Sequence, residues 1–323
     1  MNDTDYIFAV ARIRVKEKNL LSNQDIQQMI SLKDADAVLD FLMSRSWGSE
    51  DAEKTIDGVL AAEEAKTQAL IEELGIDPEI MEILSYPKLF HNLKSAIQEI
   101  VTSDPHENAF YDLASFGRMS ALQKVRDKDY KTMPAALQKA APIAYESMLK
   151  THDSQVCDQI IDKACLEAMS EASAKAKSPL LREYEALNVA LTNIKIAARA
   201  QKMRKPLSFI KDALAKCSLI NVDALAEAAA KTPEDLHKYL EIAGFRDASE
   251  ALKKSFSAFE VWCDDRLIEL IKSEKSNSVS VGPILAYYLA RENEIKTARI
   301  ILTAKANGFP DEVIEERARS MYV

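Results

Sequence analysis

Glycine is scarce in this chain of 323 residues, which has seven glycines and none between Gly117 and Gly244. Tight hairpins and phosphate-binding loops rely on positive φ angles that glycine adopts most readily, so a sheet-rich or Rossmann-like fold is disfavoured. The sequence also lacks Gly-Lys-Ser, Gly-Lys-Thr and Gly-x-Ser-x-Gly. We therefore expect a chain that does not bind ATP itself and has no serine-hydrolase site.

Cysteine and histidine are equally sparse. The four cysteines are too few for a disulfide framework, and none forms the close pair of a structural zinc site. Cys157 and Cys165 lie eight residues apart, near one face of a helix, which favours packing in a core over metal binding. The four histidines occur singly, without the spacing of a zinc site. We expect no metal and no cofactor.

Long apolar runs are missing as well. The longest stretch without a charged residue, Ser276 to Ala290, contains Gly282 and Pro283 and is shorter than the ~20 apolar residues that cross a bilayer. The apolar run from Tyr6 to Ala11 is too short for the core of a signal peptide. We expect no membrane span and a cytoplasmic location.

Basic residues are outnumbered, because 42 Lys and Arg against 51 Asp and Glu leave a net charge of −9. Such a surface repels nucleic acid, which is therefore not an expected partner. Adjacent acids such as Glu63-Glu64 point about 100° apart on a helix and cannot act on one substrate atom. No catalytic residue is predicted; a helical enzyme with scattered carboxylates would need a polar pocket with perturbed pKa values, which no spacing suggests.

The apolar residues that are present recur at helical spacing. The clearest stripe alternates steps of four and three along residues 180–198, and similar stripes cover 51–74, 152–175, 222–230 and 284–306. Prolines such as Pro78, Pro87 and Pro179 are expected to stop or restart helices. The sequence predicts an all-α fold.

Two landmarks recur along the chain. An aliphatic residue precedes Lys94, Lys195 and Lys296, which are spaced 101 and 101 residues apart, inside three amphipathic stretches. A helical aspartate followed three residues later by an aliphatic residue comes 37, 37 and 32 residues before these lysines, at Asp57, Asp158 and Asp264. This order predicts three helical domains, at 1–109, 110–207 and 208–323. We expect the aspartates to have structural roles.

Positive charge is clustered: residues 186–211 contain six bases and no acid. Cations near a helix C-terminus complement the macrodipole without any partner, or they form a docking rim for an acidic or polar surface. Both interpretations stay open. Arg12 and Arg14 differ by about 200° on a helix and cannot form one clamp. The candidate partner-contact residues are Arg12, Arg14, Lys195, Arg199, Lys202, Arg204, Lys296, Arg299 and Lys305.

Four stretches of the sequence resemble motifs of a known protein family. They are Tyr6 to Leu21, Phe90 to Lys94, Tyr184 to Lys195 and, most specific, Gly282 to Lys296 continuing through Asn307-Gly308-Phe309-Pro310 to Tyr322-Val323. Together they resemble the C subunit of the A-type and bacterial V-type rotary ATPases, the AC39 family, which includes the d subunit of the eukaryotic V-ATPase. The chain departs from that family at Thr102-Ser103 and Met203-Arg204, where members often have glycine, and at Glu294, where the other two copies have asparagine.

The resemblance implies three similar helical domains arranged as a pseudo-threefold funnel. It implies a non-catalytic central-stalk rotor subunit, a socket on the cytoplasmic face of the membrane ring of c/K proteolipid subunits. The D and F subunits of the central shaft would insert into this socket, and torque would pass between the A3B3 head and H+ or Na+ movement at the ring. The alternative is a generic all-helical scaffold or adaptor, which would not bind a D–F shaft.

Overall fold

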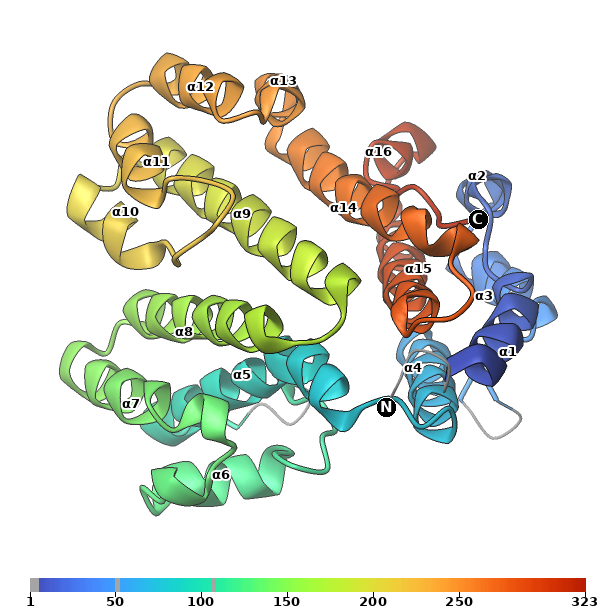
Figure 1. The fold of residues 1–323 in the computed structure, drawn as a ribbon, viewed down its shortest axis with the longest axis horizontal. Helices are drawn as coiled ribbons and strands as arrows, with labels where there is room; N and C mark the ends of the chain where they lie inside the picture. Colours follow the sequence, from blue (N-terminus) through green and yellow to red (C-terminus); the bar gives the residue numbers. More distant parts are fainter. Residues whose placement is uncertain (1–5, 50–52, 106–108) are drawn as a thin grey trace. The chain divides into compact units, whose positions relative to one another are not determined.

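The computed structural model describes residues 6–49, 53–105 and 109–323, which contain α-helices and short 3-10 turns and no strand (Figure 1). The predicted all-α fold is confirmed. The α-helices are α1 (Ile7–Glu17), α2 (Asn23–Ser31), α3 (Ala35–Ser44), α4 (Ile56–Glu73), α5 (Pro78–Thr102), α6 (Arg118–Arg126), α7 (Ala140–Thr151), α8 (Ser154–Lys175), α9 (Pro179–Lys202), α10 (Leu207–Ala213), α11 (Val222–Ala229), α12 (Pro233–Ile242), α13 (Arg246–Lys254), α14 (Phe256–Lys272), α15 (Gly282–Ala306) and α16 (Asp311–Glu315). The 3-10 turns are η3 (Tyr130–Thr132), η4 (Ala135–Leu137) and η5 (Ser273–Ser276).

Several helices begin at side-chain caps that the sequence encodes. Ser22 and Asp25 form a reciprocal capping box at α2, and Asp34, Thr55 and Ser255 accept from backbone N–H groups at the starts of α3, α4 and α14. Such caps stabilise a helix by about 1 kcal/mol each because they satisfy donors without an intrahelical partner.

One predicted helix break is wrong. Pro87 lies inside α5 and does not end it, although proline removes one hydrogen bond from the helical ladder. The residues around it, Tyr86, Leu89 and Phe90, are buried in a core, and this packing holds the helix through the proline. Pro78 and Pro179 do begin helices, as expected.

The chain divides into two compact units, each built from separate stretches of sequence. Unit 1 comprises Met1–Asp77, Ser178–Tyr184 and Leu240–Val323, and unit 2 comprises Pro78–Lys177 and Glu185–Tyr239. The division falls inside α9 and inside α12. The three repeat domains at 1–109, 110–207 and 208–323 stay a prediction.

In unit 1, the long helix α15 is the centre of the packing. It contacts α1, α3 and α4, which lie near the beginning of the chain, and α14, which precedes it in sequence. One hydrophobic cluster joins residues such as Leu21, Leu42 and Leu60 to Ile301 and Leu302, all of them fully or almost fully buried. The first helices of the chain therefore share a core with its last long helix.

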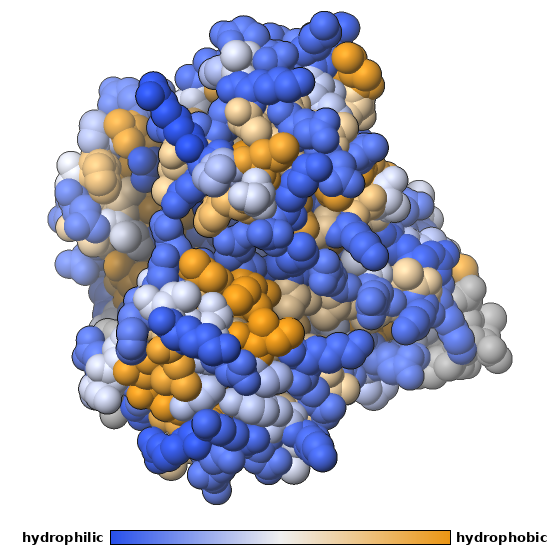
Figure 2. All heavy atoms as spheres, turned by 90° about the vertical axis from the view of Figure 1, so that its left-hand side faces the viewer, coloured by the Kyte–Doolittle hydropathy of each residue, from blue (hydrophilic) through white to orange (hydrophobic). Residues whose placement is uncertain are grey.

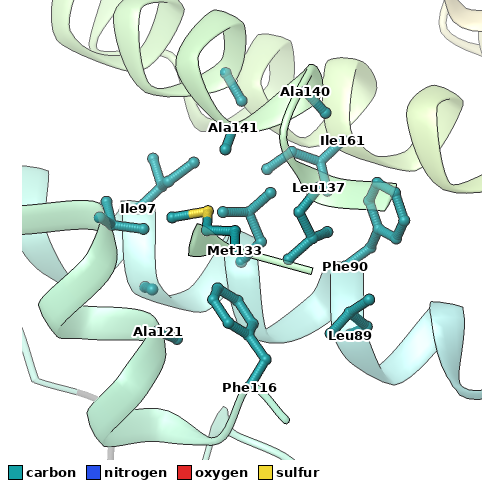
Figure 3. Packing of buried hydrophobic residues seen from close by; sticks show 14 of the residues in the cluster. Leu89, Phe90, Ile97, Phe116, Ala121, Met133, Leu137, Ala140, Ala141 and Ile161 are labelled. Carbon is teal, nitrogen blue, oxygen red and sulfur yellow. The ribbon is translucent and has the colours of Figure 1, made fainter. Parts of the chain in front are cut away.

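In unit 2, α5 packs against α6, α7 and α8. Figure 3 shows the core that they form, where Phe90 and Ile97 from α5 lie beside Phe116, Met133 and Leu137. Ala121, Ala140 and Ala141 supply small side chains from α6 and α7, so the helices approach closely around the larger residues.

The three long helices α5, α9 and α15 are followed by residues with left-handed backbone conformation. These are Ser103 (φ 59°), Arg204 (φ 53°) and Gly308 (φ 67°). After α9 and α15 the chain makes the same pair of backbone hydrogen bonds. After α9, Lys205 N donates to the Ala200 carbonyl and Arg204 N to the Gln201 carbonyl. After α15, Phe309 N donates to the Ala304 carbonyl and Gly308 N to the Lys305 carbonyl. The turn geometry typical of glycine is thus kept where this chain has serine and arginine.

Candidate functional site

A buried polar side chain occupies the position two residues before each recurring lysine. On α5 and α9 this residue is asparagine. Asn92 Nδ2 donates to the Tyr111 carbonyl at 2.9 Å, and the Tyr111 amide donates to Asn92 Oδ1 at 2.8 Å. Asn193 makes the same two bonds with Ala215, at 2.9 and 3.0 Å. Each asparagine therefore fastens the segment after its long helix back onto that helix.

On α15 the corresponding residue is Glu294, where the sequence differs from the asparagine of the other two copies. It is buried, and it accepts a hydrogen bond from the backbone amide of Leu21. Leu21 lies just before α2, so the glutamate fastens a segment from the beginning of the chain, where the asparagines fasten segments that follow their own helices. The replacement of asparagine by glutamate thus accompanies a different backbone partner.

Each recurring aspartate pairs with at least one side chain on a long helix, in agreement with the structural role that we expected. Asp57 is exposed, whereas Asp158 and Asp264 lie at helix contacts. The pairs are Asp57 with Arg299 at 2.6 Å, Asp158 with Gln98 at 3.0 Å and Lys94 at 3.9 Å, and Asp264 with Lys296 at 2.6 Å and Arg319 at 2.9 Å.

A buried ionic cluster lies between α4 and α15. The guanidinium of Arg291 donates to Glu63 and to Glu294, and all three side chains are at most 7% exposed. Lys66 Nζ donates to Glu63 at 2.6 Å, and Arg291 lies over the Trp47 ring at 4.9 Å. Buried charges need such partners because an unpaired charge in a core is very costly.

Burial changes the titration of two glutamates. Removal from water raises the pKa of Glu294 to about 7, against the opposing attraction of Arg291. Removal from water also raises the pKa of Glu185, on α9, to about 7, opposed by a 3.4 Å hydrogen bond from Asn188. Desolvation is the largest cause of both shifts, and a shift with this cause does not by itself assign a catalytic role.

Three of the four cysteines are buried and Cys217 is half-buried. Burial raises the pKa of the Cys157 thiol to about 11, and that of Cys165 is raised further in the same direction. These thiols pack as small apolar residues and are poor nucleophiles. Over the part of the chain that the structure describes, no three His, Cys, Asp or Glu residues converge as metal ligands. Within the same residues, no helix is both long and apolar enough to cross a bilayer.

The two N-terminal candidates diverge on α1. Arg12 donates to Glu73 on α4 at 2.9 Å and lies 6.0 Å from the centre of the exposed Phe8 ring. Arg14 binds both carboxylate oxygens of Glu17 and donates to the Glu274 and Asn277 carbonyls at 2.8 and 2.6 Å. The expectation that the two arginines cannot form one clamp is confirmed.

The candidates at the end of α9 point to solvent. Arg199, Lys202 and Arg204 are exposed, whereas Lys195 is half-buried. Among the described residues, Lys202 and Arg204 make no ion pair. Met203 between them is exposed, as is Leu207 at the start of α10. The end of α9 therefore presents cations and apolar side chains together.

The candidates on α15 are occupied within unit 1. Lys296 and Arg299 are exposed and pair with aspartates as given above. Lys305 is different, because its side chain is 5% exposed and donates to the Leu32 carbonyl at 2.5 Å and to Asp311 at 2.7 Å. Its ammonium group fastens α15 to the end of α2 and the start of α16.

Unit 2 also carries an open groove of about 840 Å³ between α7, α8 and α10. Its lining includes Ile143, Ile160, Ala164 and Phe209, and Ile143 is exposed. Figure 2 shows apolar side chains gathered within an otherwise hydrophilic surface on the face that carries these helices. Gln159 donates to the Phe209 carbonyl at 3.1 Å, which attaches α10 to α8 beside the groove.

Two features were missed by the sequence reasoning. The asparagines at 92 and 193 belonged to the recurring motif, yet their role as backbone clasps needs the segments 19 and 22 residues later to be in place. The ionic cluster joins residues 228 apart, and its local signal is the three-residue spacing of Arg291 and Glu294 on α15.

Comparison with known protein families gives a match to the model described as "ATP synthase (C/AC39) subunit", which covers residues 9–317 of this chain. The match extends across both structural units and includes all three long helices.

Individual relatives align with this chain over nearly their whole length. The C subunit of the V-type sodium ATPase of Enterococcus hirae is 23% identical over 320 residues, covering 96% of this chain and 97% of that protein. The C subunit of the A-type ATP synthase of Desulfurococcus sp. (strain SY) is 24% identical, with 98% and 91% covered. The C subunit of the V-type ATP synthase of Thermus thermophilus is 24% identical, with 97% and 98% covered.

Proposed function

Because the chain belongs to the ATP synthase (C/AC39) subunit family, we propose that it is the non-catalytic central-stalk subunit of a V/A-type ATPase that transports H+ or Na+. It acts as a socket that joins a shaft of D and F subunits to the membrane ring of c/K proteolipids, and through them it works with the A3B3 head. It has no active site of its own and lies on the cytoplasmic side of the membrane, held through the ring.

The observation that carries this proposal is the family match over 9–317, together with relatives that are aligned over nearly their whole length. A scaffold unrelated to rotary ATPases would not give such a match. The packing within each unit suits a torque-transmitting part, because close-packed helices resist deformation. In unit 1 the sharing of one core by the first helices and α15 adds a contact that closes the unit on itself.

We propose the nine candidate cations as the partner-contact set, and their environments rank them. Lys202 and Arg204 are exposed and unpaired among the described residues, and they flank Met203, which is also exposed. A mixture of cations and apolar side chains is typical of protein–protein interfaces, with the charges setting orientation and association rate. Arg14 and Lys305 come last, since their charged groups are occupied by internal hydrogen bonds.

The test is co-purification of the tagged chain with D and F subunits and with detergent-solubilised c-ring from the native host. We expect recovery of both partners, and no ATP hydrolysis by the chain alone. Recovery of neither partner at low salt would contradict the socket role.

The contact set is tested separately with the double variant Arg199→Glu/Arg204→Glu. Its control is Lys175→Glu/Lys177→Glu, which makes the same charge change elsewhere in unit 2. We expect weaker recovery of a partner with the first variant and unchanged recovery with the second. Unchanged binding of both partners by the first variant would remove the end of α9 from the contact set.

A further inference from the structure

A polar pocket of about 480 Å³ lies in unit 1, beside the buried ionic cluster. It is lined by α1, the turn after α3, α4 and α15, and its cations come from all four: Arg12 and Lys16, Arg45, Lys66 and Arg291. A concentration of positive charge is unusual in a chain whose net charge is −9. The volume is in the range of about 300–1,000 Å³ typical of ligand pockets.

One of the five lining cations has no ion pair within the described part of the chain. Four of the five cations are hydrogen-bonded to carboxylates: Arg12 to Glu73, Arg45 to Asp25, Lys66 to Glu63, and Arg291 to Glu63 and Glu294. Within the described part of the chain, Lys16 is the lining cation without an ion pair, and its side chain is exposed.

A second, independent feature is Tyr287, which lines the same pocket. Tyr287 is 7% exposed, so its ring is fixed by the surrounding core. Its hydroxyl makes no hydrogen bond to any described residue and is not among the buried polar atoms without a partner, so it is free to bind a ligand. Burial raises the pKa of Tyr287 to about 12, which keeps the group protonated and able to donate.

Two exposed apolar side chains of α1 lie close in sequence to the lining cations. Phe8 is 74% exposed and lies one helical turn before Arg12, which stacks against it, and Val15 is exposed next to Lys16. A small charged metabolite would leave these side chains uncovered. A protein segment with a carboxylate and a neighbouring apolar side chain would satisfy the pocket and cover them.

We propose that this pocket receives a carboxylate side chain from an acidic, partly apolar segment of a partner protein, with Lys16 and the Tyr287 hydroxyl as its ligands and Phe8 as its apolar neighbour. Lys16, the lining cation without an ion pair, matches the single charge of a carboxylate, whereas a phosphate dianion would place twice that negative charge near Glu63 and Glu73 at the wall. The identification of the partner as another component of the ATPase rests on the function proposed above.

The pocket is tested with the peptide Ac-Leu-Glu-Ala-Leu-Glu-Ala-NH2, its glutamine counterpart and inorganic phosphate as probes. The full chain is labelled with carbon-13 at tyrosine ring carbons, and the Tyr287 signal is assigned with Tyr287→Phe. We expect a saturable shift of this signal with the glutamate peptide and none with the glutamine peptide. Lys16→Glu should weaken binding by about tenfold or more, whereas Lys18→Glu, the same change just after α1 but outside the pocket, should leave it unchanged.

No saturable shift with the glutamate peptide, or equal binding by Lys16→Glu and wild type, would overturn the proposal. Phosphate binding as tight as the peptide's would also overturn it, because the pocket would then not select a carboxylate segment. Assembly with D–F and the c-ring separates the two proposals. If Lys16→Glu and Lys16→Ala assemble as well as wild type, the docking role fails while the socket function stands. If wild type does not assemble but binds the glutamate peptide, the socket function fails while the pocket stands.

Discussion

Asn193 and Ala215 exchange two hydrogen bonds across 22 residues of sequence, with the side-chain amide of Asn193 satisfying both the carbonyl and the N–H of Ala215. Both residues are fully buried. The Ala215 backbone lies between α10 and α11, where no helical or strand ladder pairs it. One side chain therefore replaces the backbone partners that a buried loop would otherwise lack.

Asn193→Ala should lower the free energy of unfolding by about 2–4 kcal/mol, because it leaves the buried N–H and carbonyl of Ala215 without partners. Asn193→Asp should also destabilise, since its carboxylate meets the Ala215 carbonyl without a donor. Urea unfolding followed by circular dichroism measures both. Thr192→Ala is the control on the same helix. A loss for Asn193→Ala no larger than for Thr192→Ala would show that the clasp contributes nothing.

Arg204, which follows α9 with a left-handed backbone conformation, gives a prediction of increased stability. Arg204 adopts φ 53°, which costs a residue with a Cβ about 1 kcal/mol relative to glycine. Arg204→Gly should therefore raise the free energy of unfolding by about this amount, and Gly308→Ala should lower it similarly. Arg204→Ala separates charge from conformation and should not stabilise. Equal urea midpoints for Arg204→Gly and Arg204→Ala would contradict the argument.

The helices were predictable because their apolar stripes are local. The stripes at 152–175, 222–230 and 284–306 correspond to α8, α11 and α15, and the stripe at 51–74 corresponds to α4, with 51 and 52 outside the described residues. The prediction failed at Pro87, where the apolar core on both sides of the proline outweighs the lost hydrogen bond. Local propensity does not contain that packing energy.

The candidate cations were harder to predict, because a sequence shows a charge but not its partner. Lys305 and Arg204 are both bases near the end of a long helix, yet the first is enclosed by α2 and α16 and the second is exposed. The enclosing residues are up to 273 positions away in sequence. The Arg291 cluster was missed for the same reason.

Arg291 should be the most sensitive charged residue of unit 1. Arg291→Met leaves Glu294 buried without a cation, while Glu63 keeps Lys66, and the change should cost about 3–5 kcal/mol of unfolding free energy. Adding Glu294→Gln to this variant should recover part of the loss, since it removes the carboxyl that has lost its cation. A double-mutant cycle measured by urea unfolding gives the coupling.

The matched control is Arg299→Met, which breaks the exposed pair with Asp57 on the same helix. Exposed pairs contribute roughly 0–1 kcal/mol, so this variant should unfold near the wild-type midpoint. If Arg291→Met were tolerated as well as Arg299→Met, or if Glu294→Gln did not restore any stability, the cluster could not hold α15 to α4 electrostatically.

The last prediction concerns pH and Glu185. Burial raises the pKa of this carboxyl to about 7, so the folded chain keeps a proton that the unfolded chain loses near pH 4.5. The contribution of Glu185 to the free energy of unfolding is therefore greatest below pH 4.5 and falls as pH rises towards 7, by roughly 3 kcal/mol in all. Glu185→Gln should remove this part of the slope and stabilise the chain at pH 8.

Urea unfolding from pH 4.5 to 8 measures the slope, with Glu183→Gln, an exposed neighbour on α9, as the control. Parallel profiles for wild type and Glu185→Gln would mean that the carboxyl is charged in the folded chain throughout this range.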